Sequence, residues 1–130
     1  MDRSVEDSLV AAAQAVAAHA HAPYSKFAVG AALLGSDGSV YVGCNVENAS
    51  FGATQCAERS AVGAMVAAGV RELSAVAVFT DTSEPTLPCG ICRQVLREFA
   101  EDAVVICATP SGRVQHQLSE LLPYAFSFEG

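Results

Sequence analysis

Three cysteines constrain this chain more than any other feature, because they stand in two short segments that can meet around one metal ion. Cys56 opens the segment Cys-Ala-Glu-Arg, and Cys89 and Cys92 lie in Pro-Cys-Gly-Ile-Cys-Arg-Gln. Each segment follows a loop and begins a predicted helix. Cys89 and Cys92 are separated by two residues, so both can reach one metal from the first turn of a helix. Cys56, at the start of another helix, can supply a third thiolate.

This donor set predicts a catalytic zinc site. Zinc with three protein ligands keeps a fourth position for water, whereas structural zinc sites normally fill all four positions with protein. Helix N-termini favour thiolates, because their unsatisfied N–H groups and the helix dipole stabilise negative charge. Arg59 is expected to draw off part of the excess charge of three thiolates. Arg93 and Gln94 are predicted to anchor the loop that carries the ligands.

Glu58 lies two residues after Cys56, close to the predicted metal. This spacing suits a neighbouring catalytic group better than a further ligand, and proton transfer is its predicted role. A cysteine or histidine two residues before a glutamate, combined with Pro-Cys-x-x-Cys, is the signature of zinc-dependent deaminases. As an ordinary first-turn carboxylate, Glu58 would need no function, because negative charge is favoured there.

The composition sets limits on partners and location. A chain of 130 residues that is 52% hydrophobic predicts one domain over residues 1–130. The apolar run at residues 10–18 is short and lacks a basic flank, so we expect neither a signal peptide nor a membrane span. A net charge of −7 with only 7 Lys and Arg opposes nucleic-acid binding and suits a small neutral substrate. Five cysteines in such a chain favour a reducing compartment, which predicts a cytoplasmic location.

Alternating helical and strand-like segments predict an α/β fold with one mixed sheet covered by helices. The first helix is expected to begin near Ser4, which caps it, and to end before Pro23. A turn at Ser36-Asp37-Gly38 joins the strands of a hairpin. The predicted helices cover residues 4–20, 56–68, 89–100 and 118–122, and the predicted strands cover residues 27–34, 40–44, 73–80 and 103–108.

Further motifs extend over nearly the whole chain. They are Pro-Tyr-Ser-Lys-Phe-Ala-Val-Gly-Ala-Ala from residue 23, Gly-Cys-Asn-Val-Glu-Asn-Ala-Ser from residue 43, and Leu-Leu-Pro from residue 121. With the cysteine segments, they make the chain resemble the small homotetrameric zinc-dependent cytidine deaminases. The resemblance implies the cytidine deaminase fold, with five strands and helices on both faces. It also implies hydrolysis of cytidine and deoxycytidine to uridine and deoxyuridine in pyrimidine salvage.

The same resemblance implies roles for individual residues. Phe27 would pack on the pyrimidine, and Asn45 and Glu47 would hold ribose hydroxyls. The backbone of Ala57 and the carboxylate of Glu58 would read the edge of the base. A neighbouring subunit would contribute Phe126 to close the pocket. Four residues depart from the expected pattern and leave substrate range and subunit packing open: Phe51, Phe79, Leu87 and Ile91.

Simpler interpretations exist for several of these residues. The cysteines could form a structural zinc site completed by a histidine, or a redox pair at Cys89 and Cys92. The candidate histidines are His19, His21 and His116. Phe27 and Phe126 could be packing residues, and Asn45 and Glu47 turn formers. The alternative enzyme is a deaminase of a blasticidin-type nucleoside antibiotic. The two remaining cysteines, Cys44 and Cys107, are expected to be buried without a chemical role.

Overall fold

A five-stranded mixed sheet in the order β2-β1-β3-β4-β5 forms the centre of the protein, whose computed structural model describes residues 1–128. β3 and β4 run parallel, and every other neighbouring pair is antiparallel. The predicted α/β class with a mixed five-stranded sheet is therefore confirmed. The strands are β1 (Val29–Gly35), β2 (Val40–Cys44), β3 (Leu73–Thr80), β4 (Val104–Thr109) and β5 (Gly112–Gln117).

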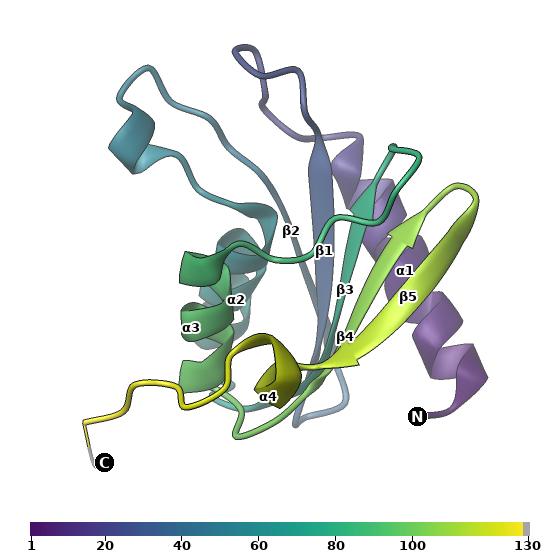
Figure 1. Ribbon diagram of the computed structural model, residues 1–130, viewed down its shortest axis with the longest axis vertical. Helices are drawn as coiled ribbons and strands as arrows, with labels where there is room; N and C mark the ends of the chain where they lie inside the picture. The colour runs from purple at the N-terminus through teal and green to yellow at the C-terminus, as the bar shows by residue number, and fades with distance from the viewer. Residues whose placement is uncertain (129–130) are drawn as a thin grey trace.

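Helices cover both faces of this sheet (Figure 1). α1 (Arg3–Ala17) packs on β1 and β3, while α2 (Ala57–Ala67) lies on the opposite face against β1 and β2. α3 (Gly90–Glu98) packs beside α2, and the short α4 (Leu118–Leu121) follows β5 directly. The first residues of α2 and α3 therefore lie at one end of the helical layer, where the cysteine segments are.

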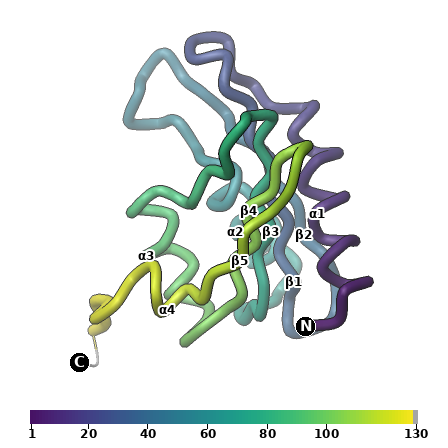
Figure 2. Tube along the Cα trace, turned by 45° about the vertical axis from the view of Figure 1, so that its right-hand side comes forward, coloured from purple at the N-terminus to yellow at the C-terminus, as the bar shows by residue number. Residues whose placement is uncertain are grey.

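The two faces of the sheet bury separate apolar clusters. One lies under α1 and includes Leu9, Phe79 and Ile106, while the other lies under α2 and α3 and includes Leu33 and Met65. Polar loops project beyond the same end of the sheet, where residues 18–28 and 45–56 lie side by side in both views (Figures 1 and 2).

Glycines let both helical layers approach the sheet closely. A Cβ atom at Gly30 would lie 1.9 Å from the carbonyl oxygen of Ala13 in α1, and one at Gly43 would lie 2.3 Å from the backbone nitrogen of Ala61 in α2. Such distances are far below van der Waals contact. Gly43 thus determines how near the first turns of α2 can come to β2.

The helix begins near Ser4 as predicted, but its predicted cap and end were wrong. Asp2, and not Ser4, caps α1, because the Asp2 carboxylate accepts hydrogen bonds from the backbone N–H of Ser4 at 2.9 Å and from its hydroxyl. The helix ends at Ala17, three residues early, since the chain beyond it turns so that His21 can pair with Val46. This pairing is a long-range contact that helix propensity does not report.

The observed strands also differ from the predicted ones. β1 begins at Val29, so Phe27 stands in the loop before it. β5 was not predicted from the residue pattern, because its sequence Gly-Arg-Val-Gln-His-Gln is polar and almost entirely exposed. Its backbone pairs with β4 over the whole strand, and this pairing defines it as a strand.

Within residues 1–128, no helix combines enough length with enough apolar character to cross a membrane.

Candidate metal centre and active-site cavity

Cys56, Cys89 and Cys92 converge at the starts of α2 and α3. Cys56 is the N-cap residue of α2, Cys89 is the N-cap residue of α3, and Cys92 lies in the first turn of α3. The Sγ atoms of Cys56 and Cys89 are 4.0 Å apart, those of Cys89 and Cys92 are 3.4 Å apart, and all three lie within 4.8 Å of one another. Three sulfur donors at these separations fit the soft-ligand tetrahedron of zinc.

Within the described residues, no histidine joins this cluster. The five cysteines are free thiols, so Cys89 and Cys92 are not joined as a disulfide. A structural zinc site completed by His19, His21 or His116 is therefore not assembled in this structure.

The thiols differ in their surroundings. Burial, followed by the nearby Glu58 carboxylate, raises the pKa of Cys92 far above the usual value of a thiol. Burial opposes ionisation of Cys89 as well, but hydrogen bonds from Cys92 and Cys56 outweigh it and lower the pKa of Cys89. Metal binding must therefore displace a proton from the buried thiol of Cys92, which couples the affinity for metal to pH.

Arg59 lies beside the cluster. Its Nη2 atom is 3.4 Å from the Sγ atom of Cys56 and 3.3 Å from the carbonyl oxygen of Thr54. The hydrogen bond with Cys56 raises the pKa of Arg59, so the guanidinium stays charged. Its buried Nε atom has no hydrogen-bond partner among residues 1–128.

A second arginine ties the ligand loop to the end of the chain. The Nε atom of Arg93 donates to the carbonyl oxygen of Pro88 at 2.7 Å, directly before Cys89. Its Nη1 atom donates to the carbonyl oxygen of Leu121 at 2.9 Å, at the end of α4. Gln94, predicted to hold the same loop, instead donates to the carbonyl oxygen of Phe126 at 3.2 Å.

A cavity of about 180 Å³ opens beside the cysteines. Most of its wall is apolar, and a few polar groups project into it, as is usual for sites that bind small organic molecules. The wall includes four predicted site residues together with Cys56 and Cys89: Phe27, Asn45, Ala57 and Glu58. The structure thus brings a predicted acid–base residue, a predicted stacking residue and two metal ligands into one space.

Glu58 is the titratable group best suited to chemistry in this cavity. Its side chain is buried at 5% exposure, and it follows the fully buried Ala57 in the first turn of α2. Burial raises the pKa of Glu58, against smaller opposing effects of its own backbone and of Arg59. A carboxyl group with a raised pKa can carry a proton near neutral pH.

Asn45 and Glu47 do not share one space. Asn45 lines the cavity with Phe27, but its amide already bonds to the backbone at Phe27 and Val29. Glu47 lines an adjoining cavity of about 440 Å³, which shares Thr54 with the first. The hydrogen bond from the Ser25 hydroxyl, helped by backbone N–H groups, lowers the pKa of Glu47 against the opposing effect of burial, so its carboxylate is ionised.

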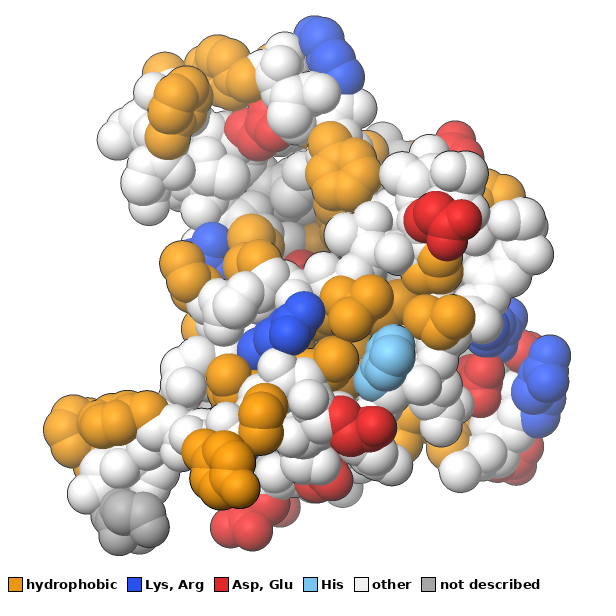
Figure 3. Space-filling model, in the orientation of Figure 1, with side chains coloured by type: hydrophobic (Ala, Val, Ile, Leu, Met, Phe, Trp, Pro, Cys, Tyr) orange, Lys and Arg blue, Asp and Glu red, His pale blue; other side chains and the backbone are white. Residues whose placement is uncertain are grey.

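Phe126 lies away from the cavity, on the C-terminal segment beside α3. Its ring packs edge to face with Phe128, with centroids 5.3 Å apart, and remains 66% exposed. Figure 3 shows hydrophobic side chains gathered on this segment, and Tyr124 and Phe128 are fully exposed. Within one chain, Phe126 cannot close the cavity that Glu58 lines.

Several cavity residues were missed by the sequence analysis. Thr54, Gln55 and Thr86 contribute polar side chains to the wall, beside Val29 and Val78. Thr86 stands three residues before Cys89, so its closeness to a ligand was a usable signal. Among the four departures from the family pattern, Leu87 lines the cavity, Phe79 is buried under α1, and Phe51 and Ile91 are exposed.

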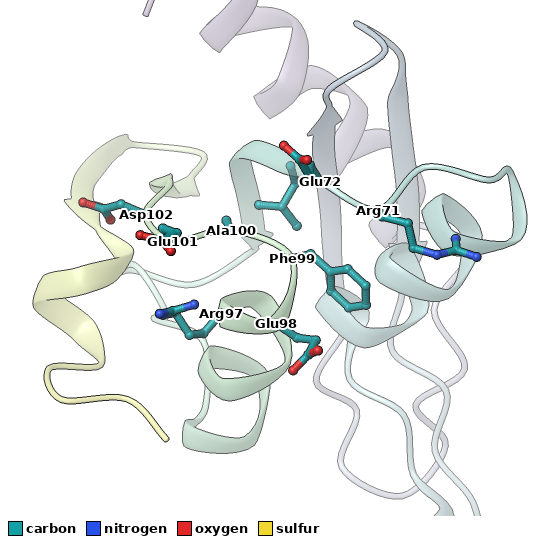
Figure 4. Close-up of a pocket in the computed structure, with 9 residues that line it drawn as sticks. Arg71, Glu72, Arg97, Glu98, Phe99, Ala100, Glu101 and Asp102 are labelled. Carbon is teal, nitrogen blue, oxygen red and sulfur yellow. The ribbon is translucent and has the colours of Figure 1, made fainter. Parts of the chain in front are cut away.

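A larger groove of about 530 Å³ lies at the opposite end of the helices, around the end of α3 and the start of β3. Figure 4 shows the side chains of Arg71 and Arg97 pointing apart, with carboxylates between and beside them. Charges of both signs alternate there, and Arg71 donates to the carbonyl oxygen of Val66 at 3.1 Å. The groups do not converge on a common point, so this groove is a weaker candidate for the active site than the smaller cavity beside the cysteines.

Comparison with known proteins agrees with this geometry. Residues 3–108 match the family described as the cytidine and deoxycytidylate deaminase zinc-binding region. A cytidine deaminase of Sporosarcina psychrophila is 45% identical over 125 residues, which cover 95% of this chain and 92% of that protein. A cytidine deaminase of Halalkalibacterium halodurans is 50% identical over 112 residues, covering 85% of each.

Solved structures show the same fold. The crystal structure of cytidine deaminase from Burkholderia pseudomallei has a TM-score of 0.89 and 43% identity, and the match covers 97% of this chain and 100% of that one. The enzyme from Mycobacterium tuberculosis has a TM-score of 0.82 and 42% identity, with 95% and 98% covered. With its three-cysteine cluster and buried glutamate, the chain belongs to the zinc-dependent cytidine and deoxycytidylate deaminase family.

Proposed function

We propose that this zinc-dependent deaminase hydrolyses cytidine and deoxycytidine to uridine and deoxyuridine with release of ammonia. The observation that carries the proposal is the position of Glu58, a buried carboxyl group in the wall of a small cavity that Cys56 and Cys89 also line. The cavity is small and largely apolar, which suits a planar base, and no Lys or Arg lines it among the described residues.

Cys56, Cys89 and Cys92 would hold the zinc ion. Bound there, zinc supplies an acidified water molecule as the nucleophile. The Glu58 carboxylate accepts a proton from the attacking water and delivers it to N3 of the pyrimidine, while the water oxygen bonds to C4. Glu58 then takes the remaining proton from the new hydroxyl group on C4 and passes it to the amino group, the C4 carbonyl forms, and the bond between C4 and nitrogen breaks to release ammonia.

The remaining residues bind and orient the nucleoside in this proposal. Phe27 packs on the pyrimidine ring, and the backbone of Ala57 reads its edge together with Glu58. Asn45 and Glu47 recognise the ribose. Glu47 lies in the cavity that adjoins the base site and is ionised, so its carboxylate is ready to accept hydrogen bonds from sugar hydroxyls. Arg59 offsets part of the thiolate charge.

A homotetramer of single-domain chains completes the site. Five large apolar side chains are more than 60% exposed: Phe51, Ile91, Tyr124, Phe126 and Phe128. Exposed apolar surface of this kind favours association between chains. In the assembly, Phe126 of one chain would close the cavity of a neighbouring chain. We place the enzyme in the cytoplasm, where it would serve pyrimidine salvage.

An ultraviolet assay of cytidine conversion tests the function directly. Purified, zinc-loaded protein should deaminate cytidine with a higher kcat/KM than cytosine or blasticidin S. A site built to bind a hydroxyl rejects analogues that lack it by up to ~10⁴–10⁵-fold, so cytosine should be a very poor substrate. Preference for blasticidin S or cytosine would overturn the nucleoside assignment while leaving the zinc chemistry in place.

A further inference from the structure

The Glu47 carboxylate is held by the segment that leads to Phe27. One of its oxygens accepts hydrogen bonds from the backbone N–H groups of Tyr24 at 2.9 Å and Ser25 at 3.1 Å. The other accepts a hydrogen bond from the hydroxyl of Ser25. An ionised carboxylate has about four acceptor positions, so these three donors leave about one for a ligand.

Ser25 carries this network on to Phe27. Its Oγ atom donates to Glu47 and accepts a hydrogen bond from the backbone N–H of Phe27 at 3.0 Å. Asn45 holds the other side of Phe27, because its Nδ2 atom donates to the Phe27 carbonyl oxygen at 2.7 Å. Both peptide groups of Phe27 are therefore bound by side chains that connect to the segment around residues 45–47.

The backbone between Ser25 and Phe27 needs this support. Lys26 has φ +63°, a left-handed conformation that is unfavourable for residues other than glycine. Its N–H group bonds to the carbonyl oxygen of Ala22 at 2.9 Å, which closes a turn just before Phe27. Phe27 itself is 39% exposed and lies in a loop before β1, so neither full burial nor a place in a strand fixes the direction of its ring.

We propose that Ser25 is a positioning residue that couples sugar binding at Glu47 to the placement of Phe27 against the base. This proposal rests on the proposed nucleoside deaminase function. A ribose hydroxyl at the remaining acceptor position of Glu47 immobilises the carboxylate, and through the Ser25 hydroxyl it immobilises the peptide before Phe27. Groups linked in one hydrogen-bond network reinforce each other. Loss of the sugar contact should therefore reduce the contribution of the Phe27 ring to kcat/KM, and loss of the ring should reduce the contribution of the sugar contact.

The test compares cytidine with 2′,3′-dideoxycytidine in four proteins: wild type, Phe27→Ala, Ser25→Ala and the double variant. For each, the ratio of the two kcat/KM values gives the penalty for removing the sugar hydroxyls. This penalty should be at least about fivefold larger in wild type than in Phe27→Ala, a difference within the range for coupled residues. In the Ser25→Ala background the two penalties should agree within about twofold.

Two further variants separate coupling from a general loss of structure. Ser25→Thr keeps the hydroxyl and should restore the coupling, whereas Ser74→Ala, at an exposed position of β3, should leave it unchanged. If Ser25→Ala loses its fold or its zinc, Ser25→Cys repeats the comparison with a weak donor of similar shape. Coupling that persists in Ser25→Ala, or in Ser25→Cys where that variant replaces it, would overturn the proposal. A wild type that does not deaminate cytidine would instead overturn the proposed function.

Discussion

The guanidinium of Arg93 lies 2.9 Å from the carbonyl oxygen of Leu121 and joins two parts of the chain that are 28 residues apart. The same side chain bonds to the carbonyl oxygen of Pro88, next to a predicted zinc ligand. One residue therefore connects the ligand loop with the end of α4, from which the aromatic C-terminal segment departs. Arg93 thus forms a hydrogen-bonded link between the start of that segment and the ligand loop.

Replacing Arg93 should loosen both connections. Arg93→Met removes two hydrogen bonds made by a charged group, and each such bond contributes about 1.5–3 kcal/mol. We expect a lower midpoint of thermal unfolding and faster loss of zinc to a chelator. Arg97→Met, one turn further along α3, is the matched control and should change both quantities much less. Equal zinc release from the two variants would contradict the role of Arg93.

Glu58→Gln should keep the fold and the zinc but lose turnover, because an amide preserves the shape of the side chain and cannot carry the proton. General acid–base catalysis contributes about 10²–10⁴-fold, so kcat for cytidine should fall by at least about a hundredfold. Glu98→Gln, at an exposed position of α3, serves as control. Activity of Glu58→Gln within a few-fold of wild type would remove Glu58 from its catalytic role.

In the metal-free protein, Glu58→Gln should raise stability although it abolishes turnover. Burial raises the pKa of Glu58 in the folded state above its value in the unfolded chain, near 4.3. The stability associated with its protonated form is present below pH 4.3 and is lost as the pH rises through the folded pKa. Metal-free Glu58→Gln should therefore unfold at a higher temperature than metal-free wild type at pH 8, with the difference shrinking toward pH 4. A difference independent of pH would show that Glu58 ionisation is not its source.

Zinc content should follow the cysteine cluster. Cys56→Ala removes one of three sulfur donors and should reduce bound zinc well below one ion per chain, as measured by metal analysis, and abolish deamination. Cys44→Ala changes a cysteine outside the cluster and should keep full zinc content. Burial raises the pKa of Cys107 to about 11, so this thiol should also stay unreactive and contribute nothing to metal binding.

Gly43→Ala tests the contact that places α2. Its new Cβ atom would lie 2.3 Å from the backbone nitrogen of Ala61 and 2.7 Å from the carbonyl oxygen of Ala57, and backbone atoms cannot give way cheaply. Overpacking of this kind costs about 1–3 kcal/mol, and the shift of α2 should also lower kcat by moving Glu58. Gly63→Ala, within α2 and with open space around it, should instead stabilise the protein by about 0.5–1 kcal/mol. Denaturant unfolding curves of both variants measure the difference.

Local sequence signals were sufficient for the elements that depend on neighbouring residues. The buried strand β3 was predicted with its observed boundaries, and Gly69, with φ +88°, follows the end of α2 as expected. The placement of Cys56 and Cys89 at helix starts was also correct, because polar loops and helix-forming runs meet at both positions. Short-range chemistry decides such features, so they can be read from adjacent residues.

Long-range pairing decided the rest. β5 exists because its backbone pairs with β4, and α1 ends early because His21 pairs with Val46. The family resemblance implies one shared role for Asn45 and Glu47 at the ribose, but the tertiary structure directs them into adjoining cavities. The sequence by itself determined which residues can bind metal and carry protons. Only the folded chain determined their distances, burial and partners, because those depend on segments that are remote in sequence and meet through packing.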